Sequence, residues 1–233
     1  MDLSRLNKEQ QEAVKHMEGP LLILAGAGSG KTTMMTHRIA YMLEKGVSPY
    51  NILAVTFTNK AAGEMKDRIE SLTGGTRGMW VMTFHAMCVR ILRNHGEVLG
   101  FKNGFSIYDE SDKKALLKRI VKDLKIDEKI YPVSYLGSVI SSCKEAEEDP
   151  DDYIENNSMN FKAETVAKVY ARYMEDLQQN NAMDFDDLLW NVVKLFEASS
   201  EVLSYYEQRF KYIMVDEYQD TNYLQYKLIH ALA

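Results

Sequence analysis

The residue pattern with the most specific chemistry is a glycine-rich loop near the N-terminus. After an apolar segment, the chain reads Gly26-Ala27-Gly28-Ser29-Gly30-Lys31-Thr32-Thr33. Such a loop can curl its backbone N–H groups around a polyphosphate, and the helix that follows points its positive end at the same oxygens. Lys31 would reach the β- and γ-phosphates and the Thr32 hydroxyl would hold Mg²⁺. The pattern therefore predicts a nucleotide site.

The loop departs from the usual pattern at one position. Where most such loops have their first glycine, this chain has Ala25. The departure is small, because this residue stands at the end of the preceding predicted strand. A glycine-rich turn before a helix is the competing interpretation, and glycine's average frequency of about 7% makes this spacing improbable by chance.

A second chemical pattern is a pair of carboxylates near the C-terminus. Asp216 and Glu217 follow the apolar run Tyr212–Val215. Ligands of open α/β sheets bind at the carboxyl ends of the strands, so both acids should face the glycine-rich loop. Asp216 would hold Mg²⁺, and Glu217 would orient and deprotonate an attacking water. Alone, the pair could be a turn or a helix cap; together with the loop it favours a hydrolase over a small-molecule kinase.

The elements that must position these residues follow from periodicity. Four short apolar runs are predicted as buried strands: Leu21–Ala25, Ile52–Phe57, Met79–Thr83 and Tyr212–Val215. A helix is predicted over Thr58–Leu72, with Ala62, Met65, Ile69 and Leu72 on one face. Strands that alternate with helices indicate an α/β fold with a parallel sheet and right-handed crossovers.

The middle of the chain has a different pattern. From about Ser111 to Asn181 apolar residues recur at helical spacing, and no buried strand is predicted. We therefore expect an all-helical domain, 111–183, inserted between two segments of one α/β domain, 1–110 and 184–233. Asp184–Asp187, at the return point, is more typical of a helix N-terminus than of a metal site.

Composition excludes some classes of protein and leaves others open. The 233 residues are 45% hydrophobic and carry a net charge of −6. No run of about 20 apolar residues could span a bilayer, and two distant cysteines favour a reducing cytoplasm. Residues 145–155 hold seven acids and 113–125 hold six bases against one acid. A solvated face is the plain interpretation of the acidic run, whereas the basic run could contact DNA.

Further motifs resemble those of superfamily 1 DNA helicases of the UvrD/PcrA/Rep type, in the family order and over nearly the whole chain. The matching segments are Leu6–Gln10 (Q motif), Ala25–Thr33 (motif I), Thr56–Ala62 (motif Ia), Thr83–His85 (motif Ib), Asp184–Leu189 and Val215–Asn222 (motif II). The resemblance implies a RecA-like P-loop NTPase domain interrupted by a helical insertion. It also implies an ATP- and Mg²⁺-dependent motor that moves 3′ to 5′ on single-stranded DNA and unwinds duplex junctions.

The resemblance also assigns roles to individual residues. Gln10 would read adenine, the loop Ala25–Thr33 would hold the phosphates, and Arg38 would lie near the nucleotide. The single-strand path would be lined by Phe57, Asn59, Lys60, Thr83 and His85, since aromatic faces stack on bases and polar groups hold the backbone.

Several of these residues have a simpler interpretation. Gln10 stands three residues after Asn7 and could close a capping box. Phe57 could belong to the core, His85 could merely start a helix, and Lys60 could be an exposed helix charge.

The resemblance stops short of the family's full length. Members continue into motif III and a second RecA-like domain whose arginines stabilise the transition state, so we expect this chain alone to bind nucleotide weakly and hydrolyse little. Other functions stay open: a helicase–nuclease subunit of the AddA/RecB kind, a nucleotide-gated DNA-binding module without unwinding or, less favoured, a phosphotransferase.

Overall fold

The computed structural model describes residues 2–26 and 28–233. Its backbone contacts divide the chain into two compact units. The first unit comprises residues 1–87, 204–221 and 231–233, and the second comprises 88–203 and 222–230. In the described part of the chain, no helix is both long and apolar enough to cross a membrane.

The first unit is built on a parallel three-stranded sheet. Its strands are β1 (Ile52–Thr56), β2 (Trp80–Thr83) and β5 (Tyr212–Val215), in the order β2-β1-β5. Thr56 lies opposite Thr83 and Val55 opposite Val215, so all three strands end at one edge. Three of the four predicted strands are thus confirmed, with small differences at their ends.

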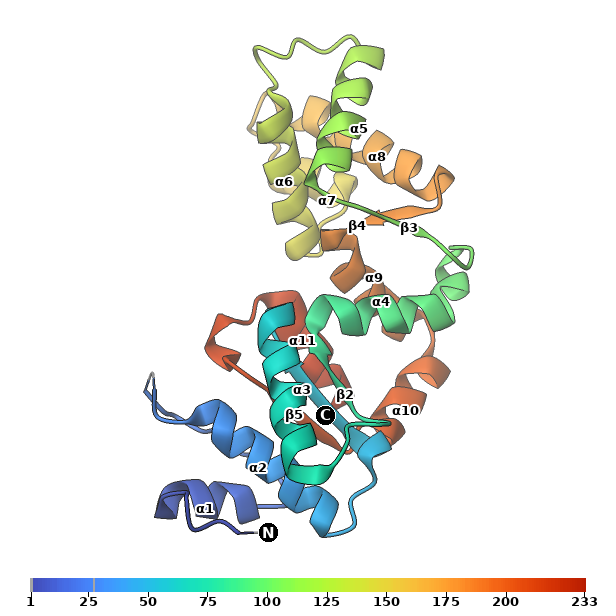
Figure 1. Cartoon of the computed structure of the whole chain (residues 1–233). Coiled ribbons are helices and arrows are strands. Elements are labelled where there is room, and N and C mark those ends of the chain that lie inside the picture. The colour runs from blue at the N-terminus through green and yellow to red at the C-terminus, as the bar shows by residue number, and fades with distance from the viewer. Residues whose placement is uncertain (1, 27) are drawn as a thin grey trace. The chain divides into compact units, whose positions relative to one another are not determined.

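Helices cover both faces of this sheet (Figure 1). On one face lie α2 (Lys31–Glu44) and α3 (Asn59–Thr73), whose side chains share a buried cluster with alternate residues of the strands. On the other, Trp80 packs against Tyr206 of α10 (Ser200–Arg209) and Phe210. The predicted helical face is confirmed at Ala62, Met65 and Ile69, but Leu72 is exposed because α3 ends at the next residue.

The predicted strand Leu21–Ala25 is wrong in this structure. The segment has no strand pairing, and Leu22 and Leu24 are 70% and 88% exposed. Only Ile23 packs inward, against the cluster that joins α1 (Lys8–Lys15) to α2. An apolar run forms a strand only where a neighbour can pair with its backbone, and in the described residues the sheet ends at β5.

The second unit is mainly helical. The remaining elements of the chain are α4 (Phe84–His95), which begins in the first unit, β3 (Ser106–Tyr108), α5 (Glu110–Asp123), α6 (Val133–Glu145), α7 (Pro150–Asn156), α8 (Ala163–Gln179), β4 (Ala182–Asp184), α9 (Phe185–Ala198), α11 (Tyr223–Leu232), and three short 3₁₀ helices, Pro49–Asn51, Gly96–Leu99 and Tyr218–Asp220. β3 and β4 pair as a small parallel sheet. Residues 111–181 are free of strands, as predicted, but β4 enters the last two residues of the expected all-helical segment.

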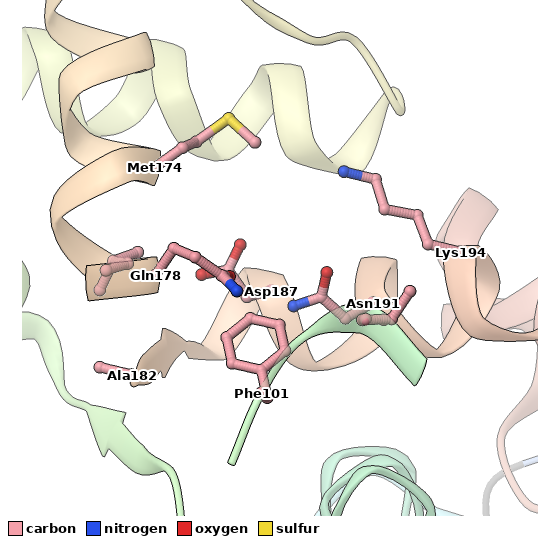
Figure 2. Close-up of a pocket in the computed structure, with 9 residues that line it drawn as sticks. Phe101, Met174, Gln178, Ala182, Asp187, Asn191 and Lys194 are labelled. Atoms are coloured by element: carbon pink, nitrogen blue, oxygen red, sulfur yellow. The ribbon is translucent and has the colours of Figure 1, made fainter. Parts of the chain in front are cut away.

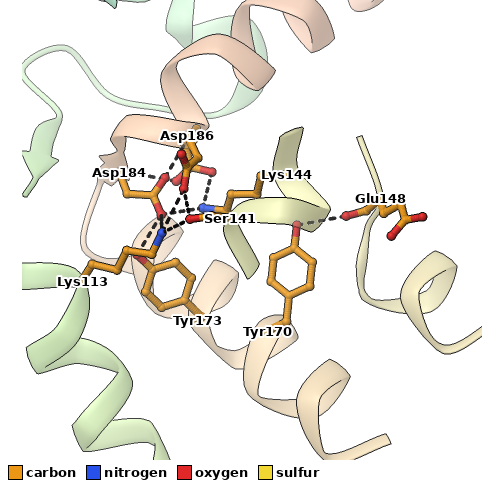
Figure 3. Close-up of polar contacts among 9 residues, drawn as sticks. Lys113, Ser141, Lys144, Glu148, Tyr170, Tyr173, Asp184 and Asp186 are labelled. Atoms are coloured by element: carbon orange, nitrogen blue, oxygen red, sulfur yellow. Dashed lines mark hydrogen bonds and ion pairs between the residues drawn. The ribbon is translucent and has the colours of Figure 1, made fainter. Parts of the chain in front are cut away.

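A buried ionic cluster holds the second unit together where α9 begins (Figure 3). Asp184 caps α9 in a capping box with Asp187, and Lys144 contacts both carboxylates, at 2.8 and 2.7 Å. Tyr173 donates a hydrogen bond to Asp184 at 2.9 Å. The Asp184–Asp187 pair is thus a helix N-terminus, as predicted.

The charged runs are only partly solvated faces. Lys113 of the basic run is 4% exposed and bonded to Asp186 at 2.9 Å, so it is not available to a nucleic acid. In the acidic run, Asp149 caps α7 and Glu147 pairs with Lys227 at 2.7 Å.

Candidate nucleotide site

The glycine-rich loop adopts a backbone that its glycines permit. Gly28 and Gly30 have φ values of +76° and +85°, a region that side chains with a Cβ disfavour. The Ser29 hydroxyl donates to the Gly26 carbonyl at 2.7 Å, which closes the turn. Ala27, expected to contribute to the phosphate cradle, lies outside the described residues.

The loop leads directly into α2. Gly30 is the N-cap, so no side chain satisfies the free N–H groups of the first turn. An uncapped helix start beside a lysine attracts an anion. The residues present thus fit a polyphosphate. Thr32 and Thr33 lie in this first turn, half-buried, and the Thr33 carbonyl accepts hydrogen bonds from the helix residues Thr36 and His37.

Lys31 joins the two chemical patterns of the sequence. Its ammonium donates to the Ala25 carbonyl at 3.2 Å and lies 3.5 Å from Oε2 of Glu217. The structure therefore brings the loop lysine to the acidic strand end, as predicted. The lysine is 28% and the glutamate 42% exposed, so water screens this pair and its partners can exchange.

The two carboxylates at the end of β5 have different surroundings. Asp216 is 8% exposed, and its backbone N–H donates to the Val55 carbonyl at 2.9 Å, which extends the sheet by one residue. Burial, together with the charge of Glu217, raises the pKa of Asp216. A divalent cation would remove this penalty by supplying the missing positive charge.

Glu217 has a strained backbone and an unpredicted partner. Its φ of +49° places a non-glycine residue in the left-handed region. Gln219 donates a hydrogen bond to Oε2 of Glu217 at 2.6 Å. This hydrogen bond, and then the charge of Lys31, lowers the pKa of Glu217. Sequence reasoning did not single out Gln219, although it lies within motif II, because its partner depends on how the chain turns after β5.

Gln10 closes the capping box and also contacts the glycine-rich loop, while its role in reading adenine stays a prediction. Its Oε1 accepts the backbone N–H of Asn7 at 3.0 Å and so completes the capping box of α1. Its Nε2 donates to the Ser29 carbonyl in the glycine-rich loop at 2.8 Å. One amide therefore links the start of α1 to the phosphate loop.

Arg38 lies away from the loop, on the α1 side of α2. It is 8% exposed and its guanidinium donates to the Ala13 carbonyl of α1; burial lowers its pKa. In this structure the side chain connects two helices. A role beside the nucleotide stays a prediction.

The residues expected to contact DNA gather at the same sheet edge. Asn59 and Lys60 are exposed in the first turn of α3, after β1. Thr83 ends β2 and its hydroxyl accepts the Ala86 N–H at 3.2 Å, at the start of α4, where half-buried His85 lies. Phe57 is half-buried, with its ring 5.6 Å from that of Phe84.

The structure also limits which side chains could serve as ligands for a metal ion. The described residues contain no group of three or more His, Cys, Asp or Glu side chains that could hold an ion. Mg²⁺ with few protein ligands, completed by phosphate oxygens and water, is the usual arrangement in nucleotide sites. Asp216 and the Thr32 hydroxyl carry oxygen atoms of that kind, and their role as Mg²⁺ ligands stays a prediction.

Comparison with known proteins agrees with this geometry. Residues 6–233 match the sequence model of the UvrD/REP helicase N-terminal domain. Proteins described as ATP-dependent DNA helicase PcrA, from Staphylococcus aureus and Staphylococcus epidermidis, are each 50% identical to the chain over 234 aligned positions. The match covers 99% of this chain and 32% of each relative, so the chain spans about a third of their length. Since the family model covers nearly every residue, the chain belongs to the UvrD/REP helicase N-terminal domain family.

Proposed function

We propose that this chain is the N-terminal ATP-binding part of a 3′–5′ DNA helicase that couples ATP hydrolysis to translocation on single-stranded DNA and to unwinding. Segments 1–110 and 184–233 would form its RecA-like domain, and 111–183 an inserted helical domain. The observation that carries the proposal is the approach of Lys31 to Glu217, at 3.5 Å, across the start of α2. The family membership agrees with it.

The side chains of the glycine-rich loop and of the β5 end would have different roles in ATP binding and hydrolysis. When ATP enters, Lys31 exchanges Ala25 and Glu217 for phosphate oxygens, and the N–H groups of the first turn of α2 bind the same phosphates. Mg²⁺, held by Thr32 and Asp216, would neutralise charge on the phosphates.

Release of Lys31 leaves Glu217 free to act as a base. Its carboxylate then accepts a proton from the attacking water, while Gln219 keeps hold of Oε2. Gln10 reads adenine from the α1 side of the loop.

Single-stranded DNA would cross the edge where β1 and β2 end. Phe57 would stack on bases, and Asn59, Lys60, Thr83 and His85 would contact the strand. A nucleotide at the end of β5 and DNA at the ends of β1 and β2 would then share one sheet edge. A movement of the glycine-rich loop on nucleotide binding would therefore reach the DNA path through this shared edge.

The relatives are about three times as long as this chain, and we infer its remaining partners from that difference. We expect the missing helicase domains to bring the arginines that stabilise the transition state, and the protein to work in the cytoplasm at duplex junctions. The chain alone should bind ATP weakly and turn it over slowly.

The test is steady-state ATPase turnover, with and without single-stranded DNA, on this chain and on a protein extended to the relatives' length. The proposal expects DNA-stimulated turnover only from the longer protein. Rapid hydrolysis by this chain alone would show that the active site is already complete. ATP binding without any DNA response in either protein would exclude a motor.

The helicase–nuclease and the DNA-binding-module alternatives are less favoured. The relatives are described as PcrA helicases, and Lys113 of the basic run is committed to Asp186. A salt titration of DNA affinity distinguishes the module, because phosphate contacts lose affinity steeply with salt and stacking does so weakly.

A further inference from the structure

A small pocket in the second unit has no part in the proposed function. It lies between α8, β4, α9 and the turn Gly96–Leu99, and has a volume of about 200 Å³. An apolar cavity of about 150 Å³ is large enough for benzene. The pocket therefore has room for a ring-sized molecule.

Part of the pocket lining is apolar. Leu99, Phe101, Met174 and Leu177 contribute to it, and Phe101 is itself 8% exposed. Figure 2 shows Phe101 and Met174 on opposite sides of the opening. A compact hydrocarbon body could pack between them.

The rest of the lining is mainly polar, and its most informative residue is Asn191. This side chain is 9% exposed and its amide points into the pocket (Figure 2). Among the residues that the structure describes, the amide has no hydrogen-bond partner. The Asn191 amide is not one of the fully buried unpaired groups of the described residues, so solvent reaches it from the pocket, and a ligand can replace that water with a hydrogen bond of its own.

Lys194, one turn further along α9, adds a positive charge. Its ammonium lies 3.3 Å from the centre of the Trp190 ring, and within the described ranges it forms no close ion pair. Asp187, which also lines the pocket, is already neutralised by Lys144 at 2.7 Å. The polar groups that line the pocket without a hydrogen bond or ion pair in the described chain are thus the amides of Asn191 and Gln178 and the Lys194 ammonium, which lies over the Trp190 ring.

We propose that this pocket binds a small organic acid with a compact apolar body. The carboxylate pairs with Lys194 and accepts a hydrogen bond from Asn191, and the body packs against Phe101 and Met174. Neither the nucleotide loop nor the sheet edge of the first unit takes part, so the proposal stands independently of the helicase function.

The experiment titrates the whole chain with three benzene derivatives of similar size and different charge: benzoate, benzamide and benzylamine. Methyl NMR of methionine follows binding, and a Met174→Leu variant identifies the Met174 signal. Benzoate should shift that signal with a Kd on the order of millimolar, benzamide about tenfold more weakly and benzylamine least. An unmoved Met174 signal, or benzylamine as the best ligand, would overturn the proposal.

Matched variants separate the two polar groups. Lys194→Met should weaken benzoate about tenfold and leave benzamide unchanged, whereas Lys168→Met, on the exposed face of α8, should change neither. Asn191→Asp keeps the shape but should repel benzoate and favour benzylamine. Because Asn191 has no hydrogen-bond partner in the described chain, its variants lose no hydrogen bond within the protein. Equal benzoate affinity in the wild type and Lys194→Met would contradict the assignment.

Discussion

Two lysines of this chain contact carboxylates in opposite ways. Lys31 is 28% exposed and lies 3.5 Å from a half-exposed Glu217, in a contact that water can replace. Lys144 is fully buried and contacts Asp184 and Asp187 at 2.8 and 2.7 Å. The first arrangement suits a group that must exchange partners when a ligand arrives, and the second one that must not move.

The sequence around each of the two lysines explains why one contact is exposed and the other is buried. Lys31 begins a helix whose first turn has no cap, so its surroundings favour an anion that the protein itself does not supply. Lys144 ends α6 against the start of α9, where Asp184 and Asp187 already close a capping box. The same pair of chemical groups would thus serve binding in one unit and packing in the other.

The largest expected effect tests the buried side of this comparison. Lys144→Met should destabilise the chain by about 3–5 kcal/mol, because buried Asp187 loses its counter-charge and Asp184 keeps only Lys113, at 3.9 Å. Denaturant unfolding measures it, with Lys31→Met as the matched control, for which less than about 1 kcal/mol is expected. Equal losses in the two variants would remove the distinction.

A pH experiment sharpens the same contrast. Burial, and then the charge of Asp184, raises the pKa of Asp187 to about 6 despite Lys144. Between about pH 4 and pH 6 the folded chain therefore binds a proton that the unfolded chain has lost, so this residue's contribution to stability falls as pH rises through that window.

The variant Asp187→Asn replaces the carboxyl group that takes up this proton with an amide that does not titrate. Its stability relative to the wild type should rise between pH 4 and pH 6, by about 2 kcal/mol. Unfolding curves at several pH values measure the difference. A difference that stays flat across the window would mean that Asp187 is ionised throughout and fully paired with Lys144.

The exposed side of the comparison is tested by ligand binding. Lys31→Met should lower the affinity for ATP by about 10- to 100-fold, since charge-assisted contacts to the phosphates are lost. Titration with a fluorescent ATP analogue gives the affinity. If binding survives with the wild-type affinity, the uncapped start of α2 holds the phosphates without the lysine.

Prediction from sequence succeeded where the information is local. The β5 boundaries, the helix after β1 and the Asp184 cap follow from periodicity and from residue types a few positions apart. The approach of Lys31 to the β5 end followed from the rule that ligands bind at the carboxyl edge of a parallel sheet.

Prediction from sequence failed where a partner distant in the sequence determines the local structure. Leu21–Ala25 has the composition of a strand, but no neighbour pairs with it in the described chain. Lys113 looked like part of a basic surface, yet it is buried against Asp186, 73 positions away. The Gln219 contact depends on the left-handed backbone of Glu217, which no spacing rule indicates.

The smallest effect concerns Gln10, whose two bonds can be separated by substitution. Gln10→Glu keeps an oxygen for the Asn7 N–H but has no donor for the Ser29 carbonyl, whereas Gln10→Ala loses both. We expect Gln10→Ala to lose about 1 kcal/mol of stability and Gln10→Glu to stay within about 0.5 kcal/mol of the wild type. Both should lose the preference for ATP over GTP, because an amide is needed to donate and accept at the adenine edge. If Gln10→Glu keeps that preference, Gln10 does not read the base. The contacts of the first unit that a nucleotide replaces are then limited to those of Lys31 with the loop and the β5 end.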